Sequence, residues 1–252
     1  MTDDMQLLID LHLPNDRQGP GSDAATQLAL TLAGVQADPG LKIADIGCGT
    51  GAAAFCLARH LGASVTAVDF LPEFLAELNR RAQGLGLAAR IHTLEASMEN
   101  LPFDDASLDV IWSEGAIYNM GFENGLKAWR RFLRPGGVLA VSELTWLTDR
   151  RPEPLTRHWD EAYPEVATAG EKIRQIETAG YEPVGYFPLG SDCWMENYYL
   201  PLKRSFPAFL DRQGNSEQAK ALVDAEQTEI DLYETYSDYV SYGFYVARRL
   251  PD

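Results

Sequence analysis

The glycine-rich segment Asp45-Ile46-Gly47-Cys48-Gly49-Thr50-Gly51 carries the clearest chemical signal in the chain, because it leaves a predicted strand and opens a predicted helix. Glycines let a backbone turn tightly and approach a ligand closely, and the free amides at a helix start can face that ligand. Gly47, Gly49 and Ala52 also satisfy the G-x-G-x-x-G/A pattern of dinucleotide-binding loops. The segment therefore predicts a cofactor loop without choosing between nucleotide-type cofactors.

Two carboxylates near this loop narrow the choice of cofactor. Asp69 ends the next predicted strand, where a carboxylate can accept hydrogen bonds from both hydroxyls of an adenosine ribose. The alternative for Asp69 is to cap the helix that begins near Pro72. Asp45, two residues before Gly47, could lie near a cofactor ammonium or orient the loop, and it would repel a pyrophosphate. The two carboxylates favour an adenosine cofactor with a cationic group.

Short β-rich apolar runs alternate with helical patterns between Leu41 and Leu144, which is typical of βαβ units and a parallel sheet. Right-handed crossovers would place the helices on both faces of that sheet. We expect an α/β, doubly wound, Rossmann-like fold with a seven-stranded sheet and a C-terminal antiparallel strand. The expected strands are Lys42–Ile46, Ser64–Asp69, Arg90–Glu95, Leu108–Ser113, Val138–Leu144, Tyr181–Leu189 and Ser241–Arg249. The helices expected between the first five are Ala52–Leu61, Pro72–Leu85 and Gly121–Leu133.

The remaining segments are expected to belong to the same single domain, residues 1–252, with its cofactor-binding core over 41–145. Residues 1–40 should form two helices, Gln6–Leu13 and Asp23–Val35, and a capping box from Thr168 to Glu171 predicts a helix over Ala169–Ala179. Substrate-side insertions are expected at 145–166 and 190–240. The second contains helix formers from Ser216 to Thr235 and is interpreted as a helical lid.

The composition restricts the partners of the chain. Its 37 acidic and 21 basic residues give a formal net charge of -16, which disfavours binding to nucleic acid or to anionic membranes. The sequence has no run of the roughly 20 apolar residues that a membrane span requires, and no positive charge precedes Arg17 to start a secretory signal. We therefore expect a cytoplasmic protein whose three cysteines are reduced.

Three motifs together resemble those of class I S-adenosylmethionine-dependent methyltransferases, in particular the ubiquinone and menaquinone biosynthesis type. They are Ala44-Asp45-Ile46-Gly47-Cys48-Gly49-Thr50-Gly51, Asn100-Leu101-Pro102-Phe103 followed by Leu108-Asp109, and Leu133-Arg134-Pro135-Gly136-Gly137. This resemblance covers about residues 41–145. Within the family the chain is most similar to uncharacterised bacterial proteins, through Arg17-Gln18-Gly19-Pro20-Gly21-Ser22, Trp112-Ser113-Glu114-Gly115-Ala116-Ile117-Tyr118-Asn119 and Cys193-Trp194.

The resemblance implies S-adenosylmethionine as the cofactor and S-adenosylhomocysteine as its product. It implies that the loop glycines line the methionine part, that Asp69 binds the ribose and that Phe70 lies beside the adenine. Ser97 and Met98 would hold the adenine edge, although many relatives carry aspartate where this chain has Ser97, and a hydroxyl is a different hydrogen-bonding group. The full set assigned to the cofactor is Asp45, Gly47, Cys48, Gly49, Gly51, Asp69, Phe70, Ser97, Met98, Ser113, Gln18 and Gly19.

Methyl transfer is an in-line displacement in which the protein supplies alignment and the correct charge state of the nucleophile. Residues after the fourth strand lie at the ligand-binding edge of such a sheet. Glu114 is there the first candidate for a general base, and anchoring of the loop or the cofactor is its equal alternative. Tyr118 and Asn119 could orient a substrate or simply pack in the loop. His158 and Glu143 are further acid–base candidates, with a surface role and a buried pair as their alternatives.

An aromatic set could wall a pocket for a flat or apolar substrate, or for an amine through cation–π contacts, or could simply pack the lid. Its members are Trp146, Trp159, Tyr163, Trp194, Tyr198 and Tyr199. No metal site is expected, because the four histidines show no ligand spacing. The expected function is methyl transfer to O, N or C of a small molecule, and a homodimer is left open. The alternatives are an NAD(P)-dependent oxidoreductase and a non-catalytic cofactor-binding protein.

Overall fold

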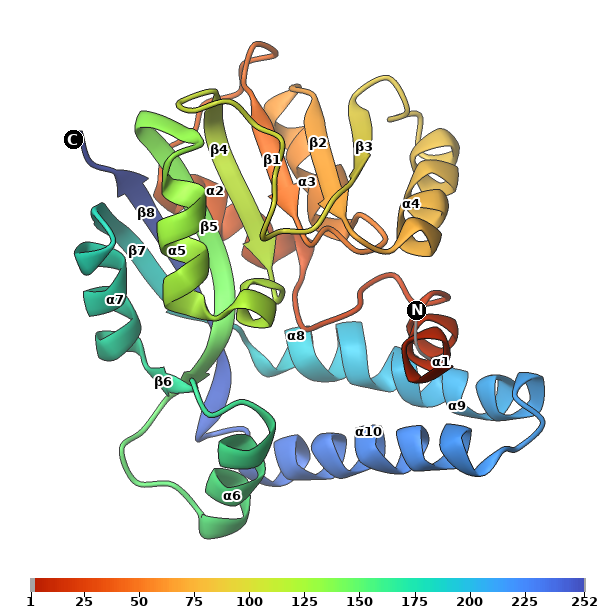
Figure 1. Ribbon diagram of the computed structural model, residues 1–252. Helices are drawn as coiled ribbons and strands as arrows, with labels where there is room; N and C mark the ends of the chain where they lie inside the picture. The colour runs from red at the N-terminus through yellow and green to blue at the C-terminus, as the bar shows by residue number, and fades with distance from the viewer. Residues whose placement is uncertain (1–2, 252) are drawn as a thin grey trace.

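A mixed sheet forms the centre of the computed structural model, which describes residues 3–251. Its strands are β1 (Ile43–Ile46), β2 (Val65–Asp69), β3 (Ile91–Glu95), β4 (Leu108–Glu114), β5 (Leu133–Trp146), β7 (Tyr181–Pro188) and β8 (Val240–Arg249). They lie in the order β3-β2-β1-β4-β5-β8-β7, with β1 to β5 parallel and β8 antiparallel to both neighbours (Figure 1). A short strand β6 (Ala167–Thr168) pairs with the end of β5. The expected Rossmann-like sheet with an antiparallel C-terminal strand is confirmed.

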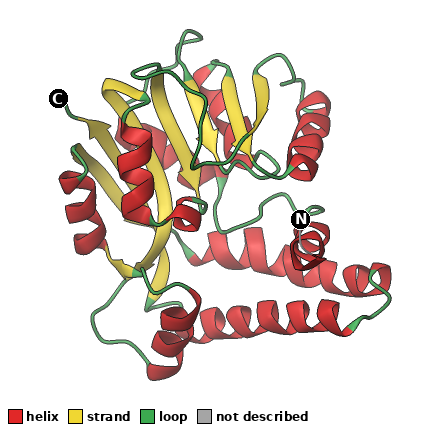
Figure 2. Ribbon diagram, in the orientation of Figure 1, coloured by secondary structure: helices red, strands yellow, loops and turns green. Residues whose placement is uncertain are grey.

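Helices cover both faces of the sheet, as its buried strands require, and Figure 2 shows this layering. One face packs against α2 (Asp23–Ala33), α3 (Ala52–Leu61) and α4 (Pro72–Gly84), in the same apolar cluster as Val65 and Val110. The other face packs against α5 (Phe122–Arg130) and α7 (Ala169–Thr178), where Trp129 and Ile176 are almost fully buried. The capping box of Thr168 and Glu171 begins α7 as expected.

A layer of helices lies across the carboxyl ends of the parallel strands, below the sheet in Figure 1. It consists of α1 (Asp3–His12), α6 (Glu153–Ala162), α8 (Ser191–Trp194), the π-helix η2 (Met195–Tyr199), α9 (Leu200–Arg212) and α10 (Glu217–Tyr236). The first helix contacts both α9 and α10. Within residues 3–251, no helix is long and apolar enough to cross a membrane. The helix expected over 216–235 is confirmed as α10.

Several boundaries differ from the expected ones for local reasons. The segment expected as a helix over Gly121–Leu133 begins with a 3-10 turn, η1 (Ile117–Met120), and its α-helix ends at Arg130. Leu133 belongs instead to β5, because it pairs with Leu108 of β4 before the register shifts at the Pro-Gly-Gly segment. The helix α9 was not expected, because Pro201 and Pro207 disfavour a helix interior. Pro201 lies in its first turn, where proline is tolerated.

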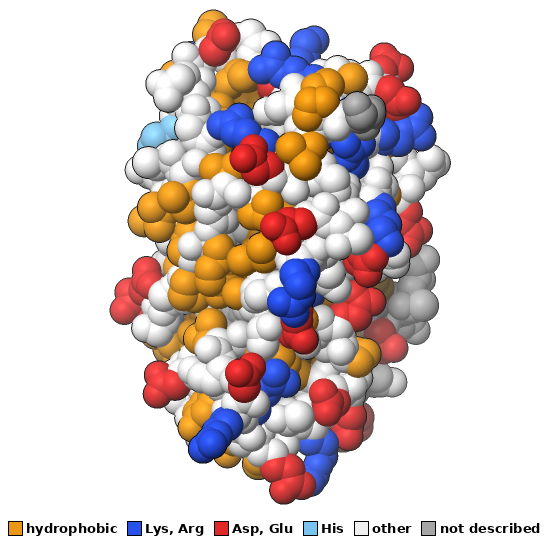
Figure 3. Space-filling view, turned by 90° about the vertical axis from the view of Figure 1, so that its left-hand side faces the viewer, with side chains coloured by type: hydrophobic (Ala, Val, Ile, Leu, Met, Phe, Trp, Pro, Cys, Tyr) orange, Lys and Arg blue, Asp and Glu red, His pale blue; other side chains and the backbone are white. Residues whose placement is uncertain are grey.

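The strand β7 is one edge of the sheet and pairs only with β8 among the described strands. Pro183 and Pro188 lie in this strand, and its register shifts between Pro183 and Gly185. Prolines and bulges protect an exposed edge from pairing with another chain. Figure 3 looks at this side of the molecule and shows apolar side chains in its middle part, with charged groups around them. Val184 of β7 is 37% exposed.

Candidate functional site

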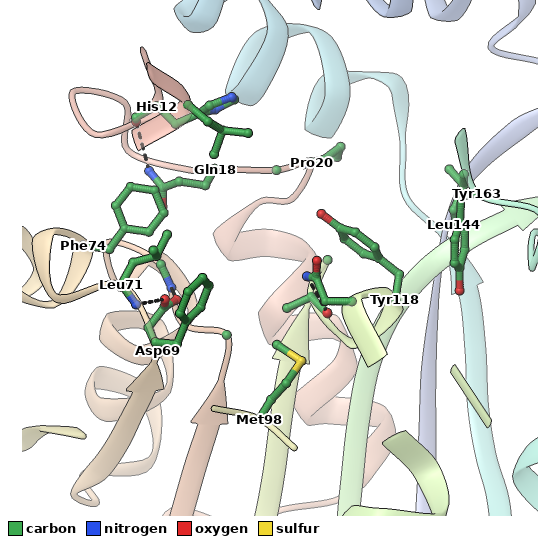
Figure 4. A pocket seen from close by; sticks show the side chains of 18 of the residues that line it. His12, Gln18, Pro20, Asp69, Leu71, Phe74, Met98, Tyr118, Leu144 and Tyr163 are labelled. Atoms are coloured by element: carbon green, nitrogen blue, oxygen red, sulfur yellow. Dashed lines mark hydrogen bonds between the residues drawn. The ribbon is translucent and has the colours of Figure 1, made fainter. Parts of the chain in front are cut away.

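A cavity of about 720 Å³ lies between the carboxyl edge of the sheet and the helical layer. This volume is within the range of about 300–1,000 Å³ found for small-ligand sites. In Figure 4, Asp69, Leu71 and Phe74 lie on one side, Leu144 and Tyr163 lie on the opposite side, and Tyr118 lies between them. The sheet order reverses between β1 and β4, so the cavity opens at the topological switch point where such folds bind ligands.

The glycine loop after β1 forms part of the cavity wall through Gly47 and Gly49. Both have positive φ angles, +71° and +53°, which favour glycine. A Cβ atom on Gly47 would lie 2.3 Å from the Cβ of Ala116, and one on Gly49 would lie 2.5 Å from Oε1 of Gln18. The loop therefore requires glycine at both positions to bring its backbone to the cavity.

The carboxylate of Asp69 is fixed at the end of β2 by two backbone amides. Its Oδ2 accepts from Gly49 N at 2.9 Å and its Oδ1 from Leu71 N at 3.0 Å. Burial raises the pKa of Asp69, while these amides oppose the shift. Each carboxylate oxygen can accept a second hydrogen bond, and Asp69 lines the cavity. It can thus receive both hydroxyls of a ribose.

The wall next to Asp69 combines an exposed aromatic ring with polar backbone. Phe70 is 53% exposed although it is a large apolar side chain, and it lines the cavity together with Ser97 and Met98. The carbonyl of Met98 accepts from Trp129 Nε1 at 3.0 Å, which fixes the loop after β3. An exposed ring beside fixed polar groups fits a flat, hydrogen-bonding group such as adenine.

The segment between α1 and α2 covers the glycine loop, and Gln18 connects the two. Its Oε1 accepts from Thr50 N at 2.9 Å, and its Nε2 donates to the carbonyls of His12 and Asn15 at 3.3 and 3.0 Å. Gln18 and Gly19 both line the cavity. The N-terminal segment is therefore part of the site wall.

Some of the residues predicted for the site are not among the described residues that line the cavity. Asp45 and Ser113 are 1% and 0% exposed, and Asp45 Oδ2 and Ser113 Oγ have no hydrogen-bond partner among the described residues. Burial, followed by the carboxylates of Glu114 and Asp69, raises the pKa of Asp45 well above its usual value. This placement favours the loop-orienting interpretation of Asp45. The predicted residues outside the wall are Asp45, Cys48, Gly51, Ser113, Glu114 and His158.

Glu114, the first candidate for a base, points into a buried network instead. Its Oε1 accepts from Thr26 Oγ1 at 2.6 Å and from Trp112 Nε1 at 2.9 Å. Its Oε2 lies 3.0 Å from the guanidinium of Arg17, and its side chain is only 8% exposed. Both oxygens are thus engaged by the protein. The geometry favours the anchoring alternative, in which Glu114 holds the N-terminal segment against β4.

Tyr118 and Asn119 lie in η1 and line the cavity, as a substrate-orienting role requires. Burial raises the pKa of Tyr118, and the carboxylates of Glu229 and Glu143 add to the effect, so its phenol stays protonated at neutral pH. His158 stacks edge-on against Trp159 behind the wall, and burial lowers its pKa. In residues 3–251, no group of three or more His, Cys, Asp or Glu side chains could hold a metal ion.

The lid side of the cavity is lined by aromatic rings and carboxylates. Of the aromatic set, Trp159, Tyr163, Trp194 and Tyr198 line the wall, whereas Trp146 and Tyr199 are buried outside it. Sequence reasoning missed four further members of this wall, because they come from distant segments: His12, Glu226, Glu229 and Tyr242. A spacing of three residues on a helix was the one available signal for the two glutamates.

Glu143 forms a buried pair behind the wall. Its Oε1 lies 3.7 Å from Lys172 Nζ, and both side chains are fully buried. Lys172 also donates to the carbonyl of Glu165 at 3.1 Å and lies over the ring of Phe122. Burial raises the pKa of Glu143 to about 7 and lowers that of Lys172. The buried-pair interpretation of Glu143 is confirmed, with its partner on α7 rather than in the lid.

Comparison with known proteins gives the same picture over most of the chain. Residues 43–137 match a family model described as a methyltransferase domain. The chain is 26% identical to a 27-O-demethylrifamycin SV methyltransferase of Amycolatopsis mediterranei, over 94% of this chain and 88% of that protein. It is 30% identical to a sterol 24-C-methyltransferase of Gibberella zeae, over 65% of this chain and 46% of that protein, so it spans less than half of that relative.

A solved structure shares the fold. The methyltransferase from Geobacter sulfurreducens, determined with S-adenosyl-L-homocysteine, superposes with a TM-score of 0.82 at 21% identity, covering 96% of this chain and 97% of that one. The nicotinamide-oxidoreductase alternative has no such support in these likenesses. The glycine loop, the carboxylate after β2 and these relatives identify the chain as a class I S-adenosylmethionine-dependent methyltransferase.

Proposed function

We propose that this methyltransferase holds its cofactor along Gly47, Gly49, Asp69 and Phe70, with Ser97 and Met98 beside the adenine. The observation that carries the proposal is the Asp69 carboxylate, which two amides fix beside the glycine loop and which faces the cavity. Gln18 and Gly19 would close the site from above. When bound, S-adenosylmethionine supplies a methyl group activated by its sulfonium. Asp45, Cys48, Gly51, Ser113 and Glu114 would support this wall from behind.

The protein's own contribution to the reaction is mainly alignment. Tyr118 and Asn119 lie between the cofactor side and the lid side, so their polar groups would orient the accepting atom. The helical layer above them would exclude water from the cavity. His158 lies behind the wall and, in this proposal, supports Trp159 rather than transferring a proton.

The acceptor in this proposal is a small molecule, which receives the methyl group on O, N or C. The enclosed cavity and the lid support this, and the relatives quoted above are named for rifamycin and sterol methylation. We also propose that residues 1–252 form one domain and that the protein acts in the cytoplasm. Whether it works as a homodimer is part of the same proposal, with the β7 side as the face to test.

A labelling experiment tests the acceptor class. The purified protein is incubated with methyl-labelled S-adenosylmethionine and a cell extract, which is then separated into small molecules, lipids, protein and nucleic acid. We expect enzyme-dependent label in the small-molecule fraction. Label confined to protein or nucleic acid would contradict the proposal.

Replacing Gln18 by alanine should weaken binding of S-adenosylhomocysteine about tenfold, because the glycine loop loses a hydrogen-bonded cover. The fold should be retained, since Gln18 is not part of the apolar core. Calorimetric titration measures the affinity. Gln27→Ala, on the exposed face of α2, is the matched control and should bind like the wild type. Equal affinities for both variants would remove Gln18 from the site.

A further inference from the structure

The lid side of the cavity carries negative charge that the protein does not balance. Glu226 and Glu229 both line the cavity, and burial raises the pKa of Glu229 to about 7. Among the described residues, no lysine or arginine lines the cavity, and His12 is the one basic side chain in its wall. His12 Nε2 lies 3.3 Å from Glu226 Oε1. Buried carboxylates are normally paired with a cation, so this pair favours a positively charged ligand.

Aromatic rings surround the two carboxylates. Trp194 packs against Tyr242 and Tyr199 at centroid distances of 5.0 and 5.7 Å, and Tyr198 packs against Tyr199 at 5.0 Å. The hydroxyl of Tyr199 donates to Glu229 Oε1 at 2.8 Å. Ring faces attract organic cations and add to the effect of a nearby carboxylate.

A second feature of this wall is a hydroxyl group that has no partner within the protein. Tyr198 lines the cavity and is only 8% exposed, and its hydroxyl makes no hydrogen bond to any described residue. The five-residue turn of η2 carries this side chain, and such π-helical turns are frequent at functional sites. A buried hydroxyl costs free energy unless it is hydrogen-bonded, so a polar group of a ligand would satisfy it.

This wall is connected to the cofactor side through Tyr242. A Cβ atom on Gly115, directly after β4, would lie 2.8 Å from Cε2 of Tyr242 and 3.6 Å from its hydroxyl. Gly115 has a positive φ of +60° and lines the same cavity as Gly47. A ligand held by the lid carboxylates would therefore share one continuous cavity with the glycine loop.

We propose that Glu226, Glu229 and the surrounding tyrosine and tryptophan rings form an acceptor subsite for an organic cation, so that the methyl acceptor carries an amine or another positively charged nitrogen. The carboxylates supply the opposite charge, the ring faces of Trp194 and Tyr242 contact the alkyl groups, and Tyr198 takes a polar substituent. An anionic acceptor is excluded by the same charges. This inference rests on the proposed function, because it assigns the lid half of that cavity.

The charge of Glu229 predicts a pH dependence for this subsite. A cation binds the ionised carboxylate, so its affinity should fall as the pH drops through about 7. The groups that face Glu229 are Glu226, His12 and Tyr199, and a protonated His12 would compete for Glu226 in the same direction. Between pH 8 and pH 6 the affinity for a permanently charged ligand should decrease about tenfold.

The test compares a cation with a neutral molecule of the same shape. Choline and 3,3-dimethylbutan-1-ol are titrated by calorimetry into the full chain saturated with S-adenosylhomocysteine. We expect choline to bind at least about tenfold more tightly than the alcohol, and Glu229→Gln and Glu226→Gln/Glu229→Gln to remove that preference. Glu234→Gln, on the exposed face of α10, should bind choline like the wild type.

Binding of S-adenosylhomocysteine by each variant separates the two hypotheses. If the wild type fails to bind it, the proposed function fails before the subsite is tested. If it binds with equal affinity to wild type and Glu229→Gln, both are folded and the choline result decides. Equal binding of choline and its neutral isostere, or binding of neither, would overturn the subsite. It would also be overturned if Glu229→Gln weakened S-adenosylmethionine binding while choline binding stayed unchanged, because the carboxylates would then serve the sulfonium.

Discussion

Replacing Asp69 by alanine should reduce the affinity for S-adenosylhomocysteine by more than about 100-fold. The variant loses two hydrogen bonds from a carboxylate to the ligand, each worth about 1.5–3 kcal/mol when one partner is charged. It also leaves Gly49 N and Leu71 N without the acceptor that fixes the glycine loop. Calorimetric titration of the purified variant measures the loss.

Two further variants separate ligand binding from folding in this experiment. Asp69→Asn keeps the shape of the side chain and one acceptor oxygen, so its affinity should lie between those of alanine and wild type. Asp104→Ala removes an exposed carboxylate that lies away from the cavity, and it should bind like the wild type. A folded Asp69→Ala protein that binds within threefold of the wild type would show that the ribose is held elsewhere.

Replacing Lys172 by methionine should destabilise the protein by about 3–5 kcal/mol at pH 8, because it leaves the buried carboxylate of Glu143 unpaired. The pKa of Glu143 is already raised to about 7 by burial, whereas the unfolded chain titrates near the ordinary value for glutamate. The folded state therefore binds more protons than the unfolded state between these values, and stability falls as the pH rises through that window. Urea unfolding at pH 6 and pH 8 should show the larger loss at pH 8.

Removing both charges provides the decisive comparison for this pair. The double variant Glu143→Leu/Lys172→Met should recover most of the lost free energy of unfolding, since two apolar side chains replace a pair that was costly to desolvate. Lys220→Met, whose partner Glu217 lies on the surface of α10, should change stability by less than about 1 kcal/mol. A single variant Lys172→Met as stable as wild type at pH 8 would contradict the account of the pair.

The core of the fold could be predicted because its signals are local. The strands β1, β2 and β4 are continuous apolar runs buried on both faces, and the glycine loop and Asp69 follow two of them directly. Parallel pairing of β1 with β2 brings these two features to the same edge of the sheet. The position of a cofactor pocket therefore follows from patterns that each span fewer than about ten residues, as strands of ordinary length do.

The acceptor half of the cavity could not be predicted in the same way. Its wall combines His12 of α1, Tyr198 of η2, Glu229 of α10 and Tyr242 of β8, and only the tertiary packing of the helical layer brings these together. Glu114 shows the same limit from the other side. Its sequence position indicated a base at the sheet edge, but Arg17 and Thr26, both from the N-terminal segment, occupy its oxygens.

The most direct test of the account is a calorimetric titration of the wild-type protein with S-adenosylhomocysteine and, separately, with NAD. The glycine loop alone is compatible with either cofactor, whereas the complete site and the family of the chain favour the first. We predict one molecule of S-adenosylhomocysteine bound per chain and no heat of binding with NAD. A folded protein that binds NAD, or that fails to bind S-adenosylhomocysteine, would contradict the central claim.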